Sequence, residues 1–407
     1  MPQPAPHAID FTSAAFLQDP YPYYDIMRAE VPILWRADQG MWFLTAYEDV
    51  SALLRDRRLG RQITHVVRRE KLGWPPIPPA HEPFHRLNSQ SLMDREPPDH
   101  TRLKSLVLKV FTPRRAEALR PQVQRVADRL LDALVERGEM NLLEDFAVPL
   151  SVTVIADLLG VPEGDRAQLR PWSAAIVAMY EITNRGDEAV AQRAVQASVE
   201  FSDYLRALIA DVRRRPQPTL ISDLAAVEEN GEQLTEDELI ATCVLILNAG
   251  HEATVNSVGN AFLALFRHPA HRALLQGDPA LIPTAVEEAL RYDTPLPLFR
   301  RWVLEDMTYK GHHFVQGTEV AFLLGAANRD PAVFPDPHRF DVTRTQNPHL
   351  SFGAGIHYCL GAPLARVEMQ VALGTLLRRL PGLRLAGEVA YHPTFVFRGL
   401  TALPVAW

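Results

Sequence analysis

Apolar residues recur at helical spacing along most of the chain. Within residues 116–137, one side of the expected helix carries Leu119, Val123, Val126, Leu130, Leu131 and Leu134, and arginines fall opposite. Similar runs predict helices over residues 143–159, 165–183, 187–215 and 363–380. The last of these runs is followed by Pro381 and Gly382, which favour a helix end.

One predicted helix is longer than the rest. It begins at Thr235, where Thr235 and Glu238 form the pattern of a capping box, and it continues to about His268, where Pro269 stops it. At 1.5 Å per residue this helix is roughly 50 Å long. Its middle is apolar on nearly every face, which predicts a helix buried in the core.

Strand-like segments are short and few. They are predicted at residues 31–35, 41–45, 302–308, 319–323, 395–396 and 402–405. The pattern therefore predicts an α+β fold that is mainly α-helical, with a long central helix and small β-sheets.

Composition limits the class of protein. The chain has 407 residues, of which 47% are hydrophobic, and no linker or repeat divides it, so we expect a single domain over residues 1–407. A net charge of −7 argues against a nucleic-acid partner.

Two cysteines cannot build a disulfide framework, which indicates a reducing, cytoplasmic location. The N-terminus resembles no signal peptide, and the longest apolar segment, 239–247, is too short to span a membrane. We expect a monomer.

The most informative segment runs from Ser351 to Gly361 and contains Cys359. Its three glycines let the backbone approach a large flat ligand, and the helix that follows presents unpaired N–H groups near the cysteine. These groups favour a thiolate, which suits one axial bond to haem iron. Alternatives are a small buried side chain, a zinc site, or a cysteine protease with His357 as partner. Zinc needs about four ligands, and the other cysteine, Cys243, lies in an unrelated apolar helix.

Four segments together resemble the cytochrome P450 monooxygenases, particularly the soluble bacterial type. The haem-ligand loop FxxGxxxCxG matches residues 352–361, and ExxR matches residues 288–291. Residues 328–341 match the segment that precedes the ligand loop, and residues 249–254 match the oxygen-activation motif imperfectly. The order and spacing fit over nearly the full length.

The resemblance implies haem b, with Cys359 as the axial ligand of the iron and its thiolate favouring O–O cleavage. It implies that Phe352 covers the sulfur and that Gly361 allows close backbone approach. Haem carries two propionates, for which the matching positions are His100, Lys104, Arg301 and His357. Lys104 is the weaker candidate, because it stands where the family often has a second arginine and lacks the bidentate fork.

Three further positions resemble a structural network of the family. Glu288 and Arg291 lie one helical turn apart on one face, and Arg339 is expected to join them. We assign these residues to support of the fold and of the haem loop, and not to chemistry.

The oxygen-activation motif departs from the family at Ala253. In the family a threonine stands there, and its hydroxyl orders waters that deliver protons. Glu252 remains as a proton carrier, whereas Thr254 is rotated by about 100° and cannot take the same place. Three hypotheses follow: a substrate hydroxyl or ordered water replaces the missing donor, the enzyme uses hydrogen peroxide, or it is a monooxygenase with modest uncoupling. A fourth possibility is that Ala253 is a small residue that simply makes room for haem.

By resemblance, the distal pocket is lined by the loop at 62–93, the helix around 177–182, the central helix, the strand at 296–299 and the turn at 394–396. The lining residues expected there are Leu245, Asn248, Ala249, Leu296, Leu298, Phe299, Phe395 and Val396. Most are apolar, which favours a mainly apolar organic substrate. Asn248 is the polar exception, and it either bonds within the protein or meets a polar group of the substrate.

The expected reaction is insertion of one oxygen atom from O₂ with two electrons from a separate protein. No flavin, nicotinamide or iron–sulfur motif is present. A ferredoxin or flavodoxin-type donor is expected on a basic proximal face formed by Arg102, Lys104, Lys109, Arg114, Arg115 and Arg366. The alternatives are a peroxide-driven peroxygenase and a non-catalytic haem-binding or sensor protein.

Overall fold

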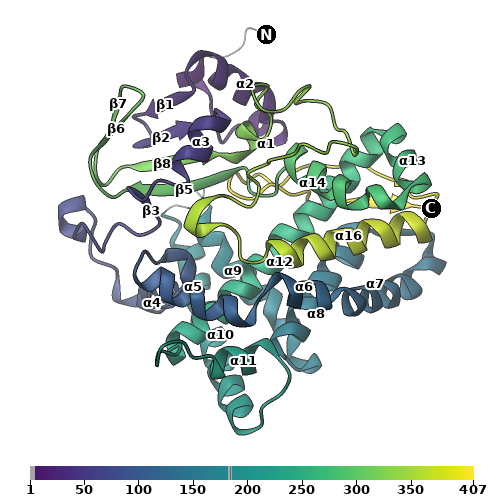
Figure 1. Ribbon diagram of the computed structural model, residues 1–407, viewed down its shortest axis with the longest axis horizontal. Helices are drawn as coiled ribbons and strands as arrows, with labels where there is room; N and C mark the ends of the chain where they lie inside the picture. The colour runs from purple at the N-terminus through teal and green to yellow at the C-terminus, as the bar shows by residue number, and fades with distance from the viewer. Residues whose placement is uncertain (1–4, 182–183, 185) are drawn as a thin grey trace.

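The computed structural model describes residues 5–181, 184 and 186–407. Figure 1 shows a large helical part below a smaller part that contains most of the sheet structure. The helical part holds α4 (Glu82–Ser89), α5 (Asp99–Val110), α6 (Pro113–Ala118), α7 (Arg120–Leu134), α8 (Val148–Leu159), α9 (Leu169–Val177), α10 (Glu188–Arg214), α11 (Leu220–Ala226), α12 (Glu236–Arg267), α13 (Pro269–Gly277), α14 (Ile282–Tyr292) and α16 (Ala362–Arg379). Beside the sheet lie α1 (Ala14–Gln18), α2 (Tyr21–Glu30), α3 (Tyr47–Leu53) and α15 (Leu324–Ala327).

The strands form three separate sheets. They are β1 (Ile33–Arg36), β2 (Met41–Leu44), β3 (Leu59–Gly60), β4 (Glu139–Asn141), β5 (Leu298–Val303), β6 (Met307–Tyr309), β7 (His312–Phe314), β8 (Glu319–Leu323), β9 (Arg384–Leu385) and β10 (Pro404–Ala406). The largest sheet has the order β1-β2-β8-β5-β3, and only β2 and β8 run parallel in it. All five residues of β8 are buried, because this strand lies in the middle of that sheet.

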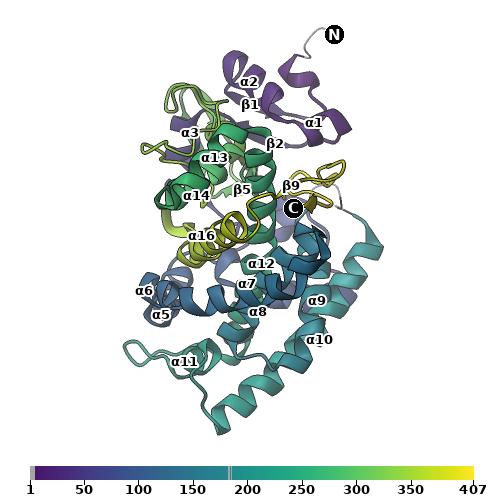
Figure 2. The same cartoon turned by 90° about the vertical axis from the view of Figure 1, so that its right-hand side faces the viewer.

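The central helix α12 confirms the prediction of a long buried helix. Its capping box is formed as expected, since Glu238 N donates to Thr235 Oγ1 at 3.2 Å and Thr235 N donates to Glu238 Oε2 at 2.9 Å. Pro269 begins α13 directly afterwards. Figures 1 and 2 show α12 running through the middle of the helical part, with α16 beside it.

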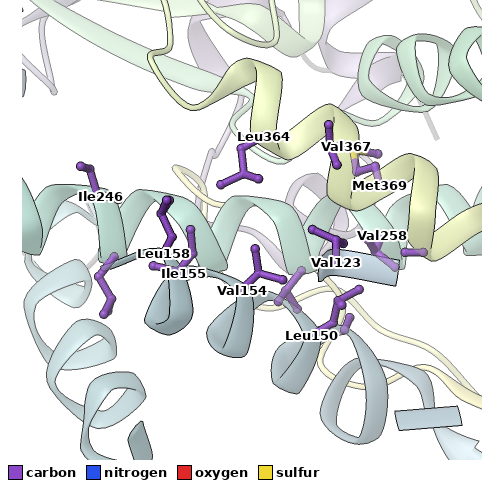
Figure 3. Close-up of a cluster of buried hydrophobic side chains, with 14 of the residues drawn as sticks. Val123, Leu150, Val154, Ile155, Leu158, Ile246, Val258, Leu364, Val367 and Met369 are labelled. Atoms are coloured by element: carbon purple, nitrogen blue, oxygen red, sulfur yellow. The ribbon is translucent and has the colours of Figure 1, made fainter. Parts of the chain in front are cut away.

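Apolar side chains hold α12 between α8 and α16. Figure 3 shows Leu364 and Val367 of α16 on one side of α12 and Leu150, Val154 and Ile155 of α8 on the other. These side chains are buried and belong to the main hydrophobic core. The α12 backbone is therefore fixed on two sides close to the expected oxygen-activation motif.

Some sequence predictions of elements were wrong in detail. The segment 116–137 is interrupted at Leu119, between α6 and α7. The expected strand at 302–308 is two strands, β5 ending at Val303 and β6 beginning at Met307. Residues 395–396 form a turn and no strand, because their N–H groups bond a carboxylate instead of a neighbouring strand. The expected helix 165–183 is α9 flanked by short 3-10 turns, and its residues 182–183 lie outside the described part of the chain.

No helix in the described part of the chain is long and apolar enough to cross a membrane.

Candidate functional site

The loop that carries Cys359 is closed by its own backbone. Cys359 N donates to the Phe352 carbonyl at 3.0 Å, and Gly353 N donates to the Leu350 carbonyl at 2.7 Å. Gly355 has a φ of +72°, and a Cβ at this position would lie 2.6 Å from the Leu54 carbonyl oxygen. Only glycine therefore fits at 355. A Cβ at Gly361 would be in ordinary van der Waals contact with Cys359 Sγ, at 3.9 Å, so Gly361 lies directly beside the sulfur.

The Cys359 sulfur is held by two N–H groups at the start of α16. The backbone N–H groups of Gly361 and Ala362 donate to it and act to lower the pKa of the thiol, as do the charges of Arg366 and Lys104. Burial outweighs them and raises the pKa above its ordinary value. The N–H groups at the helix end thus favour the thiolate, as expected, while desolvation opposes the ionised form.

A zinc site at either cysteine finds no support in the structure. Cys243 is buried in α12, and burial raises the pKa of its thiol to about 12. Among the described residues, no group of three or more His, Cys, Asp and Glu side chains is placed to hold a metal ion. Cys243 is therefore a buried side chain of the core, and Cys359 is the cysteine available to a haem iron.

Phe352 is clamped beside the cysteine loop. The Arg366 guanidinium carbon lies 4.5 Å from the Phe352 ring centroid, and Arg366 forms two hydrogen bonds to Glu287, at 2.7 and 2.8 Å. Glu287 also lies 3.1 Å from His349 Nε2. Burial alone would raise the pKa of Glu287, but His349 and Arg366 hold it at about 2. The ring that was expected to cover the sulfur is thus fixed by an ion pair.

His100, His357 and Arg301 come together as the resemblance implies. The two imidazole rings lie 4.3 Å apart between centroids, and His357 Nε2 is 3.3 Å from Glu96 Oε1. Burial, helped by the charges of His357 and Lys104, lowers the pKa of His100 to about 4. Burial also lowers the pKa of His357, against the opposing effect of the hydrogen bond that Glu96 accepts from it. Both rings are therefore neutral hydrogen-bonding groups at pH 7.

Arg301 tests whether these residues fit haem. Its side chain is 2% exposed and donates only to the Arg300 carbonyl, at 3.0 Å, within the described residues. Burial dominates and lowers its pKa, which is the sign of a cation without an adequate counter-charge. A propionate would supply that counter-charge, and His100 and His357 lie in the same cluster. The residues present fit haem.

Lys104 is hydrogen-bonded to the backbone of the cysteine loop. Its ammonium group donates to the carbonyl oxygens of Ile356 and Tyr358. Burial lowers its pKa, with Cys359 acting in the opposite direction. These bonds tie α5 to the loop, and they use two of the three donors of the ammonium group that was expected to reach a propionate.

The network around Glu288 differs from the prediction in one member. Glu288 and Arg291 are both fully buried and form hydrogen bonds of 2.7 and 2.8 Å. The expected third member, Arg339, contributes only its backbone carbonyl, which accepts from Arg291 at 3.1 Å, while its side chain is 60% exposed. Arg344 takes its place, with Nε 3.1 Å from Glu288 Oε2. The Arg344 side chain is 11% exposed, whereas the Arg339 side chain is directed to solvent near Asp341.

A stripe along one face of α12 is less buried than the rest of the helix. Ala249 is exposed, and Leu245, Glu252, Ala253 and Asn256 are half-buried, although their neighbours on the other faces are buried. These positions follow one another at helical spacing. We call them the α12 stripe. Thr254 is buried and lies off the stripe, which agrees with the expectation that its hydroxyl cannot replace the one missing at Ala253.

The backbone at the oxygen-activation motif is packed tightly. A Cβ at Gly250 would lie 2.7 Å from Ile155 of α8, and Ser151 Oγ donates to the Gly250 carbonyl at 3.2 Å. Ser257 Oγ donates to the Ala253 carbonyl at 2.7 Å. Side-chain hydroxyls thus reach two carbonyls of this turn, which helps to fix its position.

Glu252 is the ionisable group of the stripe. Burial would raise its pKa, but the neighbouring His251, with smaller effects of Arg170 and His392, holds it below the ordinary value. His251 Nε2 lies 3.2 Å from Glu252 Oε1, and His251 Nδ1 lies 3.0 Å from the Leu247 carbonyl. Glu252 is therefore ionised at neutral pH and able to accept and pass on a proton.

The expected pocket residues divide into two groups. Leu245, Ala249, Leu296, Phe299 and Val396 keep part of their surface uncovered. Leu298 and Phe395 do not: both are buried in a core cluster, where the Phe395 ring stacks 5.3 Å from Phe11. Leu298 lies on the opposite face of β5 from Phe299, and Phe395 points toward the N-terminal aromatic side chains, so the assignment of these two residues to the pocket stays a prediction that their burial does not support.

Asn248 has no partner for its side-chain oxygen in the described part of the protein. Its Oδ1 is buried without a hydrogen bond. A buried amide without a partner costs about 1–3 kcal/mol. This finding favours the interpretation that the Asn248 side chain meets a polar group of a ligand.

The proximal basic residues are mostly neutralised. Acidic neighbours pair with Arg102, Lys109, Arg115 and Arg366. Arg114 is exposed and has no acidic partner in the described residues.

Three large apolar side chains are exposed on α5 and the cysteine loop, namely Leu108, Ile356 and Tyr358. Lys104 joins α5 to the carbonyls of Ile356 and Tyr358, and Leu108 follows Lys104 by one helical turn on the same face of α5.

Comparison with known proteins gives consistent matches. The sequence model of the family "Cytochrome P450" matches residues 75–278 and 280–381. The biotin biosynthesis cytochrome P450 of Bacillus subtilis is 40% identical over 97% of this chain and 98% of its own. The solved structure of P450BioI in complex with hexadec-9Z-enoic acid ligated acyl carrier protein has a TM-score of 0.90 and 39% identity, covering 97% of this chain and 99% of that one. A myxobacterial cytochrome P450 in complex with myristic acid has a TM-score of 0.89 and 39% identity, covering 97% and 98%.

Proposed function

The chain belongs to the cytochrome P450 family and is a P450 monooxygenase that oxidises organic substrates, and from this premise we propose that it hydroxylates a mainly apolar molecule with a long hydrocarbon part. The α12 stripe carries the proposal: a row of partly uncovered, mostly apolar side chains lies on a helix that is otherwise buried. Two relatives support an extended substrate, since one is bound to a fatty-acyl carrier protein and the other to myristic acid.

Haem b is the cofactor that the family implies, and when bound it supplies the activation of O₂. Cys359 would hold its iron, and Arg301, His100 and His357 would hold its propionates. The N–H groups of Gly361 and Ala362 hold the Cys359 sulfur in place and stabilise its ionised form. Phe352, fixed by Arg366, shields this side from water.

On α12 the protein's own contribution is proton transfer and exclusion of water. Glu252 is ionised and half-buried, and it connects the stripe to His251. Ala253 offers no hydroxyl, so a water or a substrate hydroxyl must complete the path from Glu252 to the reacting oxygen. Glu252 is in place as the proton carrier, which argues against a purely non-catalytic sensor.

Two electrons come from a separate donor protein under this proposal. The exposed side chains of Leu108, Ile356 and Tyr358 lie on α5 and on the cysteine loop, and the basic residues of this proximal face are largely paired with acids. We therefore assign the donor to an apolar contact with little net charge. A ferredoxin or flavodoxin with an apolar docking face fits this surface.

Two measurements on the haem-loaded protein test the proposal. Reduction under CO should give the red-shifted Soret band of a thiolate-ligated haem, and Cys359→Ser should abolish it. Turnover of a fatty acid with NADH, ferredoxin and reductase should then exceed turnover with hydrogen peroxide. Equal or faster turnover with peroxide would instead support a peroxygenase, the alternative that Ala253 raises. Absence of the CO band would refute the haem-thiolate assignment.

A further inference from the structure

One buried carboxylate is held by three consecutive backbone N–H groups. Phe395 N and Val396 N both donate to Glu181 Oε2 at 3.2 Å, and Phe397 N donates to Glu181 Oε1 at 3.0 Å. Convergent N–H groups of this kind make a concave anion-binding site. The arrangement also fits the shape of a carboxylate, because both of its oxygens are used.

The turn that offers these N–H groups is anchored independently of Glu181. Arg398 N donates to the Pro295 carbonyl at 2.9 Å, and the Arg398 side chain binds Asp293 at 2.6 Å and the Leu17 carbonyl at 2.9 Å. The Phe395 ring packs on two aromatic rings of the N-terminal segment, Phe11 and Phe16. The N–H groups therefore keep their positions when the carboxylate is exchanged.

Glu181 fills this site without a counter-charge from any residue in the described part of the chain. The residue is 4% exposed, and it makes no ion pair with any described residue. Burial raises the pKa of its carboxyl group even though three N–H groups act in the opposite direction. Among the described residues, the partners of this carboxylate are the three backbone N–H groups, and its burial costs it much of its hydration.

The turn lies next to the α12 stripe. Asn260 Nδ2 donates to the Arg398 carbonyl at 3.0 Å, and a Cβ at Gly399 would meet Asn256 Oδ1 at 1.9 Å. Asn256 is a member of the stripe, and Val396 is half-buried within the turn. A ligand lying along the stripe can thus reach the turn with one end.

We propose that the N–H groups of Phe395, Val396 and Phe397 form a subsite for the carboxylate of the substrate, and that Glu181 occupies this subsite when no substrate is bound. The exchange conserves charge: one carboxylate leaves for water as another arrives. The hydration that the ligand loses is regained by Glu181, so burial of the apolar chain drives the exchange. The inference rests on the proposed function and narrows its substrate to a long-chain carboxylic acid.

Removal of the competing carboxylate tests the subsite. Dissociation constants of myristic acid and of 1-tetradecanol are measured by calorimetry and by the Soret shift for the haem-loaded wild type and for Glu181→Ala. The subsite predicts that Glu181→Ala tightens binding of the acid by about tenfold relative to the alcohol, because the acid no longer has to displace a side chain. Glu163→Ala, at an exposed glutamate outside the turn, should leave the ratio unchanged.

Other outcomes separate the two proposals. An acid-to-alcohol ratio that stays the same in Glu181→Ala, or a weaker affinity for the acid alone, would overturn the subsite. Glu181→Gln keeps the size of the side chain but removes its charge, so it serves if the alanine variant folds poorly, and it should shift the ratio in the same direction by a smaller factor. A normal CO band in each variant shows that the haem-thiolate proposal stands whatever the ratio does.

Discussion

The guanidinium of Arg344 binds the carboxylate of Glu288, with Nε 3.1 Å from Oε2, although the two residues are 56 positions apart in the chain. Glu288 is fully buried and also accepts from Arg291, from Asn347 Nδ2 and from the backbone N–H of Asp341. This one carboxylate therefore connects α14 to the segment that leads into the cysteine loop.

Loss of Arg344 should destabilise the protein, because a buried carboxylate would lose one of its two cations. We expect Arg344→Ala to lower the free energy of unfolding by about 3 kcal/mol and to reduce the fraction of protein that shows the CO band. Arg339→Ala is the matched control, since the Arg339 side chain is exposed and only its carbonyl is used. Thermal unfolding and the CO spectrum are measured for both variants. If Arg339→Ala lowers the free energy of unfolding and the CO band as much as Arg344→Ala does, the Arg339 side chain also supports Glu288.

The network also shows what could be predicted from the sequence. Glu288 with Arg291, and the loop from Phe352 to Gly361, were identified because each depends on residues close together in the chain. Arg344, Glu96 and Glu181 were missed, because their partners are brought to them only by folding. No local pattern distinguishes Arg339 from Arg344.

The pocket shows the same limit at the level of single strands. The sequence analysis assigned both Leu298 and Phe299 to the pocket. In the structure they lie on opposite faces of β5, because successive residues of a strand point to opposite faces. The long helix was easier, since its capping box and Pro269 mark both ends. Which face of α12 would stay uncovered depends on the packing of α8 and α16 and could not be read from an evenly apolar segment.

Restoring the missing hydroxyl at 253 should change how electrons are used. Ala253 lies on the α12 stripe next to Glu252, so we expect Ala253→Thr to raise the fraction of consumed NADH that appears as product, and to lower peroxide-driven turnover. Both quantities are measured with the tightest-binding fatty acid. Thr254→Ala is the control, because Thr254 is buried off the stripe and should affect coupling less. If coupling is the same in Ala253→Thr and wild type, position 253 has no part in proton delivery.

Glu368 gives the protein a predictable dependence of stability on pH. This residue of α16 is 1% exposed, its Oε2 has no hydrogen-bond partner among the described residues, and burial raises its pKa to about 8, with only Ser151 opposing. Below about pH 4.5 the group is protonated in both the folded and the unfolded chain and has no effect. As the pH rises from there to 8, only the unfolded chain ionises, so stability should fall by about 4 kcal/mol.

The substitution Glu368→Gln should remove this loss. We expect the melting temperatures of Glu368→Gln and wild type to be close near pH 5 and to separate as the pH rises toward 8, with the variant the more stable. Glu388→Gln, at an exposed glutamate near the C-terminus, should follow the wild type at every pH. A constant difference between Glu368→Gln and wild type over this range would show that Glu368 does not titrate as its burial requires.

Electron transfer should depend more on apolar contact than on charge. Four basic residues near the cysteine loop are paired with acids, whereas Leu108, Ile356 and Tyr358 are 42, 36 and 43% exposed. We therefore expect Leu108→Ala to slow reduction by the donor about fivefold, with an unchanged CO spectrum. Salt slows docking when exposed charges of the two proteins attract each other. Because the basic residues here are already paired within the protein, the rate of reduction should vary little between low and physiological ionic strength. Leu274→Ala removes an equally exposed leucine from α13 and should have no effect on reduction. A steep fall in rate with salt, together with a normal rate in Leu108→Ala, would mean that unpaired charges such as Arg114 guide the donor and that the apolar side chains do not.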